Sequence, residues 1–410
     1  MNLPYLTRDV AGVGGVIRQR PQDFFVQEIP AYEPSGEGEH SLCEIEKVGL
    51  STFDAVDRIA RTLDVNPREI GFAGMKDAQA VTRQHLTVPR VEDAKLLAIQ
   101  TAQLKVLSSA RHGNKLRLGH LKGNRFAIKI REVEATDVVK VKPALERLER
   151  EGMPNYFGEQ RFGRRGDNDQ LGAALLRDDP MAVLRLVLGA PLKDVDPSGA
   201  FEARRFFEGG DLQAAMKKWP RSSGMERRIL ARFMNTSSPG KALQLIEPRL
   251  RRLWLSALQS RVFNDVVAER IDGLGKLLVG DLAYLHDRGA CFTVEDVAKE
   301  QPRADAFEVS ATGPMLGYRM SLPAGEALAL EQTVYDRFKL TREDFKRPNR
   351  DQAKGDRRPI RVRPADTQIV GGVDDHGAHI TVAFTLPAGS FATVLLREVM
   401  KSDQATDDDD

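Results

Sequence analysis

The sequence predicts an α+β fold in which a helix-rich insertion interrupts a core built around one sheet. Apolar residues alternate with polar ones, as in strands, mainly before residue 150 and after residue 360. Between these regions the apolar residues follow a helical spacing. We therefore expect residues 1–151 and 360–410 to form one core, whose closing strands complete the sheet begun at the N-terminus. Residues 152–359 are expected to form the inserted domain.

The composition is that of an ordinary globular protein and excludes several other classes. Of the 410 residues, 41% are hydrophobic and 29% are charged, which allows a sizeable core. Cys43 and Cys291, the two cysteines, exclude a disulfide scaffold and a cysteine-built zinc module, and they fit a reducing compartment. The first residues do not resemble a signal peptide, and the best apolar stretch, residues 181–192, is interrupted by Arg185. We expect a cytoplasmic protein that has no membrane span and no metal.

Individual elements follow from the same periodicities. Before residue 150 we expect strands at residues 16–20, 24–29 and within 104–133, and a helix at residues 51–63. In the middle we expect helices within residues 171–176, 181–188, 227–233 and 250–271, then strands at 276–285 and 290–294. Residues 347–358 are polar, basic and rich in turn-forming residues, so they are expected to form a loop. A final helix is expected after Ser390.

The net charge of +2 conceals a strong segregation of basic residues. Residues 111–131 contain seven basic side chains and no acidic one, and residues 204–232 contain eight against three. Residues 337–363 contain eleven against four. One such segment is as often a solvated surface as a binding site, but three together favour a polyanionic partner, namely nucleic acid.

The most unusual local sequence is Gly-Phe-Ala-Gly-Met-Lys-Asp at residues 71–77, directly after a predicted strand. It lacks the spacing of a phosphate-binding loop. By itself it is most often a turn in which Asp77 accepts backbone hydrogen bonds. The functional alternative is a carboxylate held rigidly at a loop tip, where a nucleophile or base is needed.

Two further motifs each have a structural and a functional interpretation. Residues 155–163, Asn-Tyr-Phe-Gly-Glu-Gln-Arg-Phe-Gly, combine aromatic residues with Arg161, which suits either RNA contact or a packed domain junction. His376 and His379 beside Asp374 and Asp375 could serve as metal ligands, but a hairpin turn explains them better.

Taken together, the segments resemble one family, the tRNA pseudouridine synthase D family (TruD). The matching segments occur in family order and cover nearly the whole chain: residues 18–28, 36–40, 71–77, 115–126, 155–163 and 386–398. The resemblance is faint between about residues 304 and 358. It implies a mixed, mostly antiparallel sheet with flanking helices, the pseudouridine synthase fold, interrupted by an inserted helix-rich TRUD domain. It also implies an isomerase that converts uridine 13 of tRNA to pseudouridine.

The resemblance assigns a catalytic role to Asp77, whose carboxylate either adds to the ribose C1′ or removes a sugar proton. An ionised carboxylate in apolar surroundings needs a nearby cation, for which Arg18 is the first candidate and Arg397 the second. Phe126 resembles the aromatic residue that stacks on the target base. Asn124 is expected to pair with an edge of uracil or to orient the loop, and Phe24 and Phe391 match further substrate contacts. Without the resemblance, core packing would be the better interpretation of these phenylalanines.

The remaining expectations concern partners. Candidate RNA contacts are Lys115, Arg117 and Lys122 in the first basic segment, Arg161 in the motif at residues 155–163, and Arg397 at the C-terminal helix. The reaction is a redox-neutral rearrangement, so no cofactor and no metal are expected, and tRNA is the expected partner. The target base must leave its stack before the enzyme can reach the sugar. A non-catalytic RNA-binding protein and a metal-dependent nuclease are the alternatives that an activity assay in EDTA would separate.

Overall fold

A computed structural model describes residues 3–346 and 352–402 of the chain. These residues form two compact units. The first, here called the sheet unit, contains residues 5–153 and the segment from residue 362 onward. The second, the helical unit, contains residues 154–361 together with residues 3 and 4. The divisions fall within two short strands, β7 (Met153–Pro154) and β12 (Arg361–Val362).

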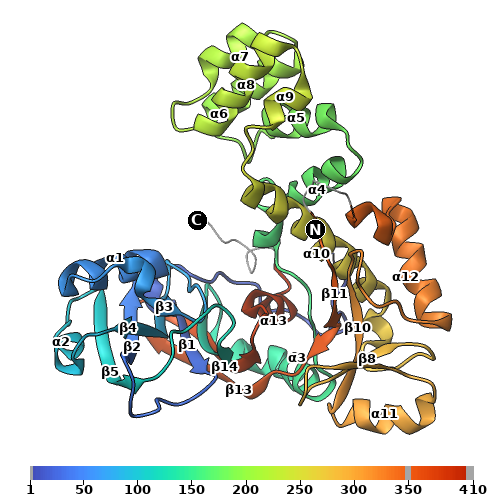
Figure 1. Ribbon diagram of the computed structural model, residues 1–410. Coiled ribbons are helices and arrows are strands. Elements are labelled where there is room, and N and C mark those ends of the chain that lie inside the picture. Colours follow the sequence, from blue (N-terminus) through green and yellow to red (C-terminus); the bar gives the residue numbers. More distant parts are fainter. Residues whose placement is uncertain (1–2, 347–351, 403–410) are drawn as a thin grey trace. The chain divides into compact units, whose positions relative to one another are not determined.

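An eight-stranded, mostly antiparallel sheet organises the sheet unit (Figure 1). Its order is β13-β14-β6-β1-β4-β2-β5, with β3 paired to β4. The strands are β1 (Phe24–Pro30), β2 (His40–Val48), β3 (Gly71–Phe72), β4 (Val81–Pro89), β5 (Leu104–His112), β6 (Leu121–Arg131), β13 (Ala365–Asp374) and β14 (Gly377–Pro387). Among the pairings described for this sheet, that of β1 with β4 is parallel and the rest are antiparallel. The predicted α+β fold class and its antiparallel character are confirmed, and the C-terminal strands do join the N-terminal ones.

Helices pack beside this sheet: α1 (Thr52–Leu63), α2 (Asp93–Leu97), α3 (Val138–Glu151) and α13 (Ala392–Met400), with 3-10 turns η1 (Pro21–Asp23), η2 (Pro67–Glu69) and η3 (Ala135–Asp137). Helix α1 illustrates why the sequence folds as it does. Ser51 and Asp54 form a reciprocal capping box that satisfies backbone N–H groups at its start. Its apolar stripe, including Val56 and Ile59, joins a buried cluster with Ile45 and Leu86 of the sheet.

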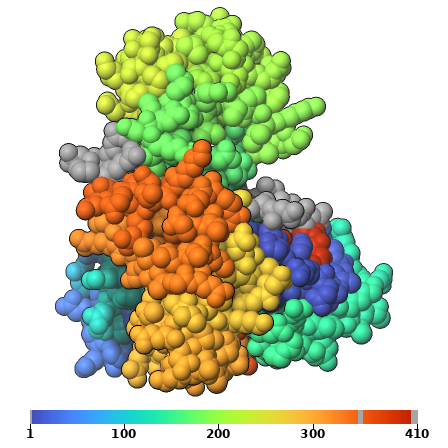
Figure 2. Space-filling view, turned by 90° about the vertical axis from the view of Figure 1, so that its right-hand side faces the viewer, coloured from blue at the N-terminus to red at the C-terminus, as the bar shows by residue number. Residues whose placement is uncertain are grey.

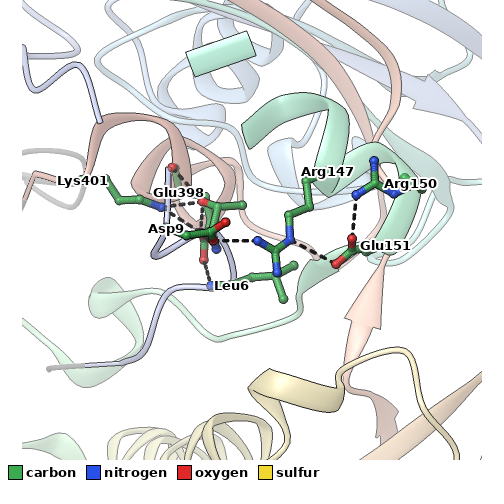
Figure 3. A network of polar contacts seen from close by, with 8 residues as sticks. Leu6, Asp9, Arg147, Arg150, Glu151, Glu398 and Lys401 are labelled. Carbon is green, nitrogen blue, oxygen red and sulfur yellow. Dashed lines mark hydrogen bonds and ion pairs between the residues drawn. The ribbon is translucent and has the colours of Figure 1, made fainter. Parts of the chain in front are cut away.

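The two ends of the chain are bound together inside the sheet unit (Figure 3). The buried carboxylate of Glu398, on α13, accepts hydrogen bonds from the backbone N–H groups of Leu6 (2.8 Å) and Thr7 (2.9 Å). It also accepts one from the Thr7 hydroxyl, and the Lys401 ammonium lies 3.1 Å away. Figure 2 shows the blue N-terminal segment beside the red C-terminal helix. The N-terminal segment is thereby fixed against α13.

The helical unit contains a small sheet and two groups of helices. Its strands, in the order β11-β10-β8-β9, are β8 (Leu282–Leu285), β9 (Cys291–Thr293), β10 (Val309–Met315) and β11 (Asp356–Pro359). Beside them lie η4 (Glu159–Phe162), α4 (Asn168–Leu176), α10 (Pro248–Glu269), η5 (Ile271–Gly273), α11 (Val297–Asp305), α12 (Gly325–Phe338) and η6 (Arg342–Phe345). A separate lobe consists of α5 (Pro180–Leu188), α6 (Ser198–Glu208), α7 (Leu212–Lys218), α8 (Gly224–Thr236) and α9 (Pro239–Leu243), packed around Leu184, Ile229 and Leu230 (Figures 1 and 2).

Several local predictions were wrong. Residues 16–20 form no strand, because Val16 makes only an isolated bridge to Arg131 and Arg18 adopts a left-handed backbone (φ 60°). Residues 356–358, expected at the end of a loop, belong to the strand β11, while residues 347–351 of that segment lie outside the described residues. Of the strand expected at residues 276–285 only the last part forms, as β8. Helix α13 has Phe391 rather than Ser390 at its N-cap. No helix among the described residues is long and apolar enough to cross a membrane.

We predict that Glu398→Gln lowers stability by about 2–3 kcal/mol, because hydrogen bonds to a buried charged group are worth more than neutral ones and the new amide N–H₂ faces donors. Thermal unfolding of the full chain measures the loss. Glu151→Gln is the matched control, since Glu151 takes part in the same network (Figure 3) with a side chain that is 39% exposed. That change should cost less than about 1 kcal/mol. Equal losses in the two variants would contradict the special role of Glu398.

Candidate functional site

The centre of the site is the loop between β3 and β4, which carries Asp77. The Asp77 side chain is 21% exposed, and its Oδ2 lies 2.8 Å from an Nη atom of Arg18. Its Oδ1 accepts a hydrogen bond from the backbone N–H of Gln79 at 2.8 Å. Asp77 therefore does brace its own turn, as a structural aspartate would, but it also offers a carboxylate to solvent beside a fixed cation. Arg18, the first candidate for that cation, occupies the position.

The parallel pairing of β1 with β4 explains why these two residues meet. In a parallel pair the N-terminal ends of both strands lie at the same sheet edge. Arg18 precedes β1 and Asp77 precedes β4, and the register pairs Phe25 with Val81. Arg18 also lies over the ring of Phe24, with its guanidinium carbon 4.4 Å from the ring centroid. Arg18 has a left-handed backbone (φ 60°), which is uncommon for a residue other than glycine.

A buried lysine is hydrogen-bonded to the loop that carries Asp77. Lys47, on β2, is fully buried, and its ammonium donates hydrogen bonds to three backbone carbonyls. These are the carbonyls of Leu50 (2.5 Å), Asp77 (2.8 Å) and Lys76 (3.4 Å). Burial lowers the pKa of Lys47 to about 8, although the negative charge of Asp77 acts in the opposite direction.

Lys76 anchors the same loop to β1. Its ammonium forms an ion pair with Glu28 at 2.8 Å, and the Glu28 side chain is fully buried. Glu28 also accepts a hydrogen bond from the backbone N–H of His85 at 3.1 Å. Burial alone would raise the pKa of Glu28, but His85 and the Lys76 ammonium outweigh it and hold the pKa below its ordinary value. On α1, Thr52 accepts a hydrogen bond from the backbone N–H of Lys76 at 2.9 Å.

The register of β1 and β6 places the predicted substrate contacts on one face of the sheet. Val26 pairs with Phe126 and Glu28 pairs with Asn124, so Phe126 lies diagonally between Phe24 and Glu28. Arg18 contacts Phe24, and Lys76 contacts Glu28. The Asp77 loop therefore lies along the sheet face that carries these residues. The structure thus brings Asp77, Arg18, Phe24, Asn124 and Phe126 together.

The aromatic residues of this row are largely buried. Phe24 is 3% and Phe126 is 7% exposed, and the Phe126 ring stacks on Phe384 at 5.2 Å. Both therefore contribute to the core, whatever else they do. Asn124 differs, since its buried Oδ1 accepts no hydrogen bond from any described residue. A buried amide oxygen that lacks a donor is costly in a finished core, so the Asn124 side chain has hydrogen-bonding capacity to spare.

The other predicted residues are placed less centrally. The loop that carries Phe391 follows β14, whose Pro387 pairs with Gly123 next to Asn124. Arg397, the second candidate cation, lies over the ring of Tyr5 at 3.8 Å. Arg117 and Lys122 are exposed, and Lys115 donates a hydrogen bond to the backbone carbonyl of Arg68 at 2.6 Å. In the helical unit, Arg161 donates hydrogen bonds to Ser256 and Ser260.

The acidic and histidine residues at 374–379 form a turn with structural ion pairs. Asp374 pairs with Lys129 (2.6 Å) and with Arg131 (2.8 Å), and it ends β13 just before the tight turn to β14. Its pKa lies far below its ordinary value because Arg131 and Lys129 bond to it. Within the described residues no group of three or more His, Cys, Asp or Glu side chains could hold a metal ion. The hairpin interpretation of this motif is confirmed.

The sequence analysis missed Lys47, Lys76, Glu28 and Thr52 as parts of the site. A signal for two of them was present. Glu28 continues the buried alternation of Phe24 and Val26, and Lys47 continues that of Cys43 and Ile45. A charged residue at a position that the alternation assigns to the core requires a partner, and the partner of each is the Asp77 loop.

The chain is similar to known proteins over nearly its whole length. The family model described as tRNA pseudouridine synthase D (TruD) matches residues 1–399. A protein of Geotalea daltonii named tRNA pseudouridine synthase D is 44% identical over 402 residues, which is 97% of this chain and 100% of that protein. One of the same name from Anaeromyxobacter dehalogenans is 36% identical over 411 residues, 100% of this chain and 99% of that protein.

A solved structure has a fold that closely resembles that of the chain. It is described as tRNA pseudouridine synthase D (TruD) of Methanosarcina mazei and superimposes with a TM-score of 0.86 at 26% sequence identity. The match covers 99% of this chain and 97% of the other.

Proposed function

The chain belongs to the tRNA pseudouridine synthase D (TruD) family, and on that premise we propose that it isomerises uridine 13 of tRNA, with Asp77 as its catalytic residue. Members of this family are isomerases that act on tRNA. The observation that carries the proposal is the pairing of a partly exposed carboxylate with Arg18 over a sheet face that carries Phe126 and Asn124. We further propose that residues 1–151 with 360–410 are the catalytic core and that 152–359 are the inserted TRUD domain.

In the proposed reaction the bond between ribose C1′ and uracil N1 breaks and a bond between C1′ and uracil C5 forms. The hydrogen on C5 is lost and N1 gains a proton, so the product is an isomer of the substrate. The Asp77 carboxylate either adds to C1′ or removes a sugar proton, and Arg18 holds it ionised and oriented. Phe126 and Asn124 hold the released uracil while it rotates, and the reaction needs no cofactor.

The proposal extends to Phe24 and Phe391, which we assign to the wall of the substrate site. Phe24 lies beneath Arg18 and is thereby one contact removed from Asp77. The target base is paired or stacked in folded tRNA, so it must be extruded at a cost of a few kcal/mol before it reaches these residues. Stacking on an aromatic ring and contacts between phosphates and basic side chains offset that cost.

The decisive experiment is Asp77→Asn, assayed for pseudouridine in unmodified tRNA in the presence of EDTA. The amide keeps the size and the hydrogen bond to Gln79 but can act neither as a nucleophile nor as a base. Pseudouridine should fall below detection while tRNA binding persists. Asp54→Asn is the matched control, because Asp54 is exposed at the start of α1, and it should retain turnover. A folded Asp77→Asn protein that still forms pseudouridine would refute the assignment.

We expect Phe126→Leu to lower turnover by about ten- to a hundredfold, since losing base–aromatic stacking costs ~1–3 kcal/mol. Leucine keeps most of the apolar bulk in the core but removes the ring. Phe126→Tyr should retain turnover. Phe384→Leu is the control, because Phe384 stacks on Phe126 within the same core. It should cost similar stability and leave turnover much closer to wild type. Identical turnover in the two leucine variants would show that Phe126 has only a structural role.

The lobe of α5–α9 supplies a test of the proposed RNA contacts in the helical unit. Arg228 and Arg232 are exposed, lie one turn apart on α8 and pair with no described carboxylate. Arg185 and Arg205 of the same lobe are 62% and 60% exposed but pair with Glu208 and Glu202. We predict that replacing Arg228 and Arg232 with Ala flattens the salt dependence of tRNA affinity by about one slope unit per lost phosphate contact. The same change at Arg185 and Arg205 removes equal charge and should flatten it less. Equal slopes in the two double variants would contradict a specific surface on α8.

A further inference from the structure

Lys47 is a buried charge of the sheet unit that the proposed reaction does not yet use. Its side chain enters the core from β2, where its neighbours in the alternation are Cys43 and Ile45, both fully buried. The register pairs Lys47 with Thr82, close to the start of β4 and to the end of the Asp77 loop. The hydrogen bonds of its ammonium go to backbone carbonyls, and no described carboxylate lies within ion-pair distance of it.

Keeping this ammonium buried lowers the stability of the fold. Removing a charge from water without an opposite charge in contact is unfavourable, and carbonyl dipoles compensate only in part. The pKa of Lys47 is about 8 in the folded chain, below the value of about 10.4 for an unfolded lysine. The folded state therefore binds fewer protons than the unfolded state between these values. By linkage, the contribution of Lys47 to stability becomes less unfavourable as pH rises from 8 to 10.4. A charge kept at such a cost is expected where it serves function.

We propose that Lys47 is a positioning residue, which fixes the carbonyls of residues 76 and 77 and supplies a second positive charge, besides that of Arg18, to the Asp77 carboxylate. This inference rests on the function proposed above. It gives Lys47 two separable effects. One is mechanical, because two of its three acceptors belong to the loop that carries Asp77. The other is electrostatic, because its charge is not matched by a carboxylate in contact.

The other charged groups around the loop are already matched. Lys76 is paired with Glu28, which also faces the ring of His85 at 3.5 Å. Asp54 is exposed and bonded to Ser51 at the start of α1. Arg18 is paired with Asp77 itself. Lys47 differs from these groups because no carboxylate in contact neutralises its charge. Its positive charge therefore acts on the Asp77 carboxylate.

The test compares Lys47→Met with Thr52→Val in the full chain. Methionine has nearly the length of lysine but neither charge nor donors, so both effects of Lys47 are lost. Valine at residue 52 removes the acceptor for the Lys76 N–H and loosens the same loop with every charge retained. For both we expect kcat on tRNA to fall, by about ten- to a hundredfold for Lys47→Met, while KM changes little. Only Lys47→Met should move the acid limb of the kcat–pH profile to higher pH, since that limb reports the group that must be ionised for turnover.

Lys47→Arg keeps the charge and should restore the acid limb even where kcat stays low. Thermal unfolding and tRNA binding establish that each variant is folded, and Lys47→Gln replaces Lys47→Met if the latter does not fold. Wild-type kcat in a folded uncharged variant, with Asp77→Asn inactive, would overturn the role of Lys47 and leave the proposed function standing. An acid limb in Lys47→Met that coincides with that of Thr52→Val would overturn the electrostatic effect. Turnover by Asp77→Asn would overturn the proposed function itself.

Discussion

The ion pair between Arg18 and Asp77 is the interaction on which the rest of the site depends. Each partner lies in a connecting segment and would be mobile without the other elements that fix it. The parallel pairing of β1 and β4 brings the two segments to one edge of the sheet. Among the strand pairings described for this sheet it is the parallel one, and it is the topological feature that brings the two sides of the candidate site together. Arg18 accepts a left-handed backbone to reach Asp77, and the bridge between Val16 and Arg131 holds the chain on its far side.

The need to hold Asp77 beside Arg18 also explains why charged side chains are buried next to the Asp77 loop. The loop that carries Asp77 is held in place although few of its own residues are apolar enough to pack. The chain solves this with polar contacts from three neighbouring elements: Glu28 of β1, Lys47 of β2 and Thr52 of α1. Each contact is largely shielded from water. In such an interior, hydrogen bonds and ion pairs are stronger than at the surface. The cost is desolvation, which is visible in the lowered pKa of Lys47.

Sequence reasoning succeeded where local rules decide the structure and failed where distant segments do. The capped helix α1 and the strands β1 and β6 were predictable. Helix capping and the alternation of buried and exposed residues each depend on only about ten consecutive residues. The alternation at residues 16–20 was misleading, because the ion pair of Arg18 with a loop sixty residues away overrides the local preference. The same holds for β11, whose residues 356–358 were expected in a loop but pair with β10, where Arg357 forms a buried ion pair with Glu331.

For the candidate site, the catalytic role expected of Asp77 rests on the family resemblance, since an aspartate after a glycine turn is ordinarily structural. Its partners were different. Glu28 and Lys47 each interrupt an apolar alternation, which is a local signal that needs no relative to be noticed. What no local signal can supply is the identity of the group on which they converge, because this depends on strand order. The joining of the chain ends at Glu398 likewise depends on contacts between distant segments, because the carboxylate on the C-terminal helix α13 accepts hydrogen bonds from the backbone N–H groups of Leu6 and Thr7.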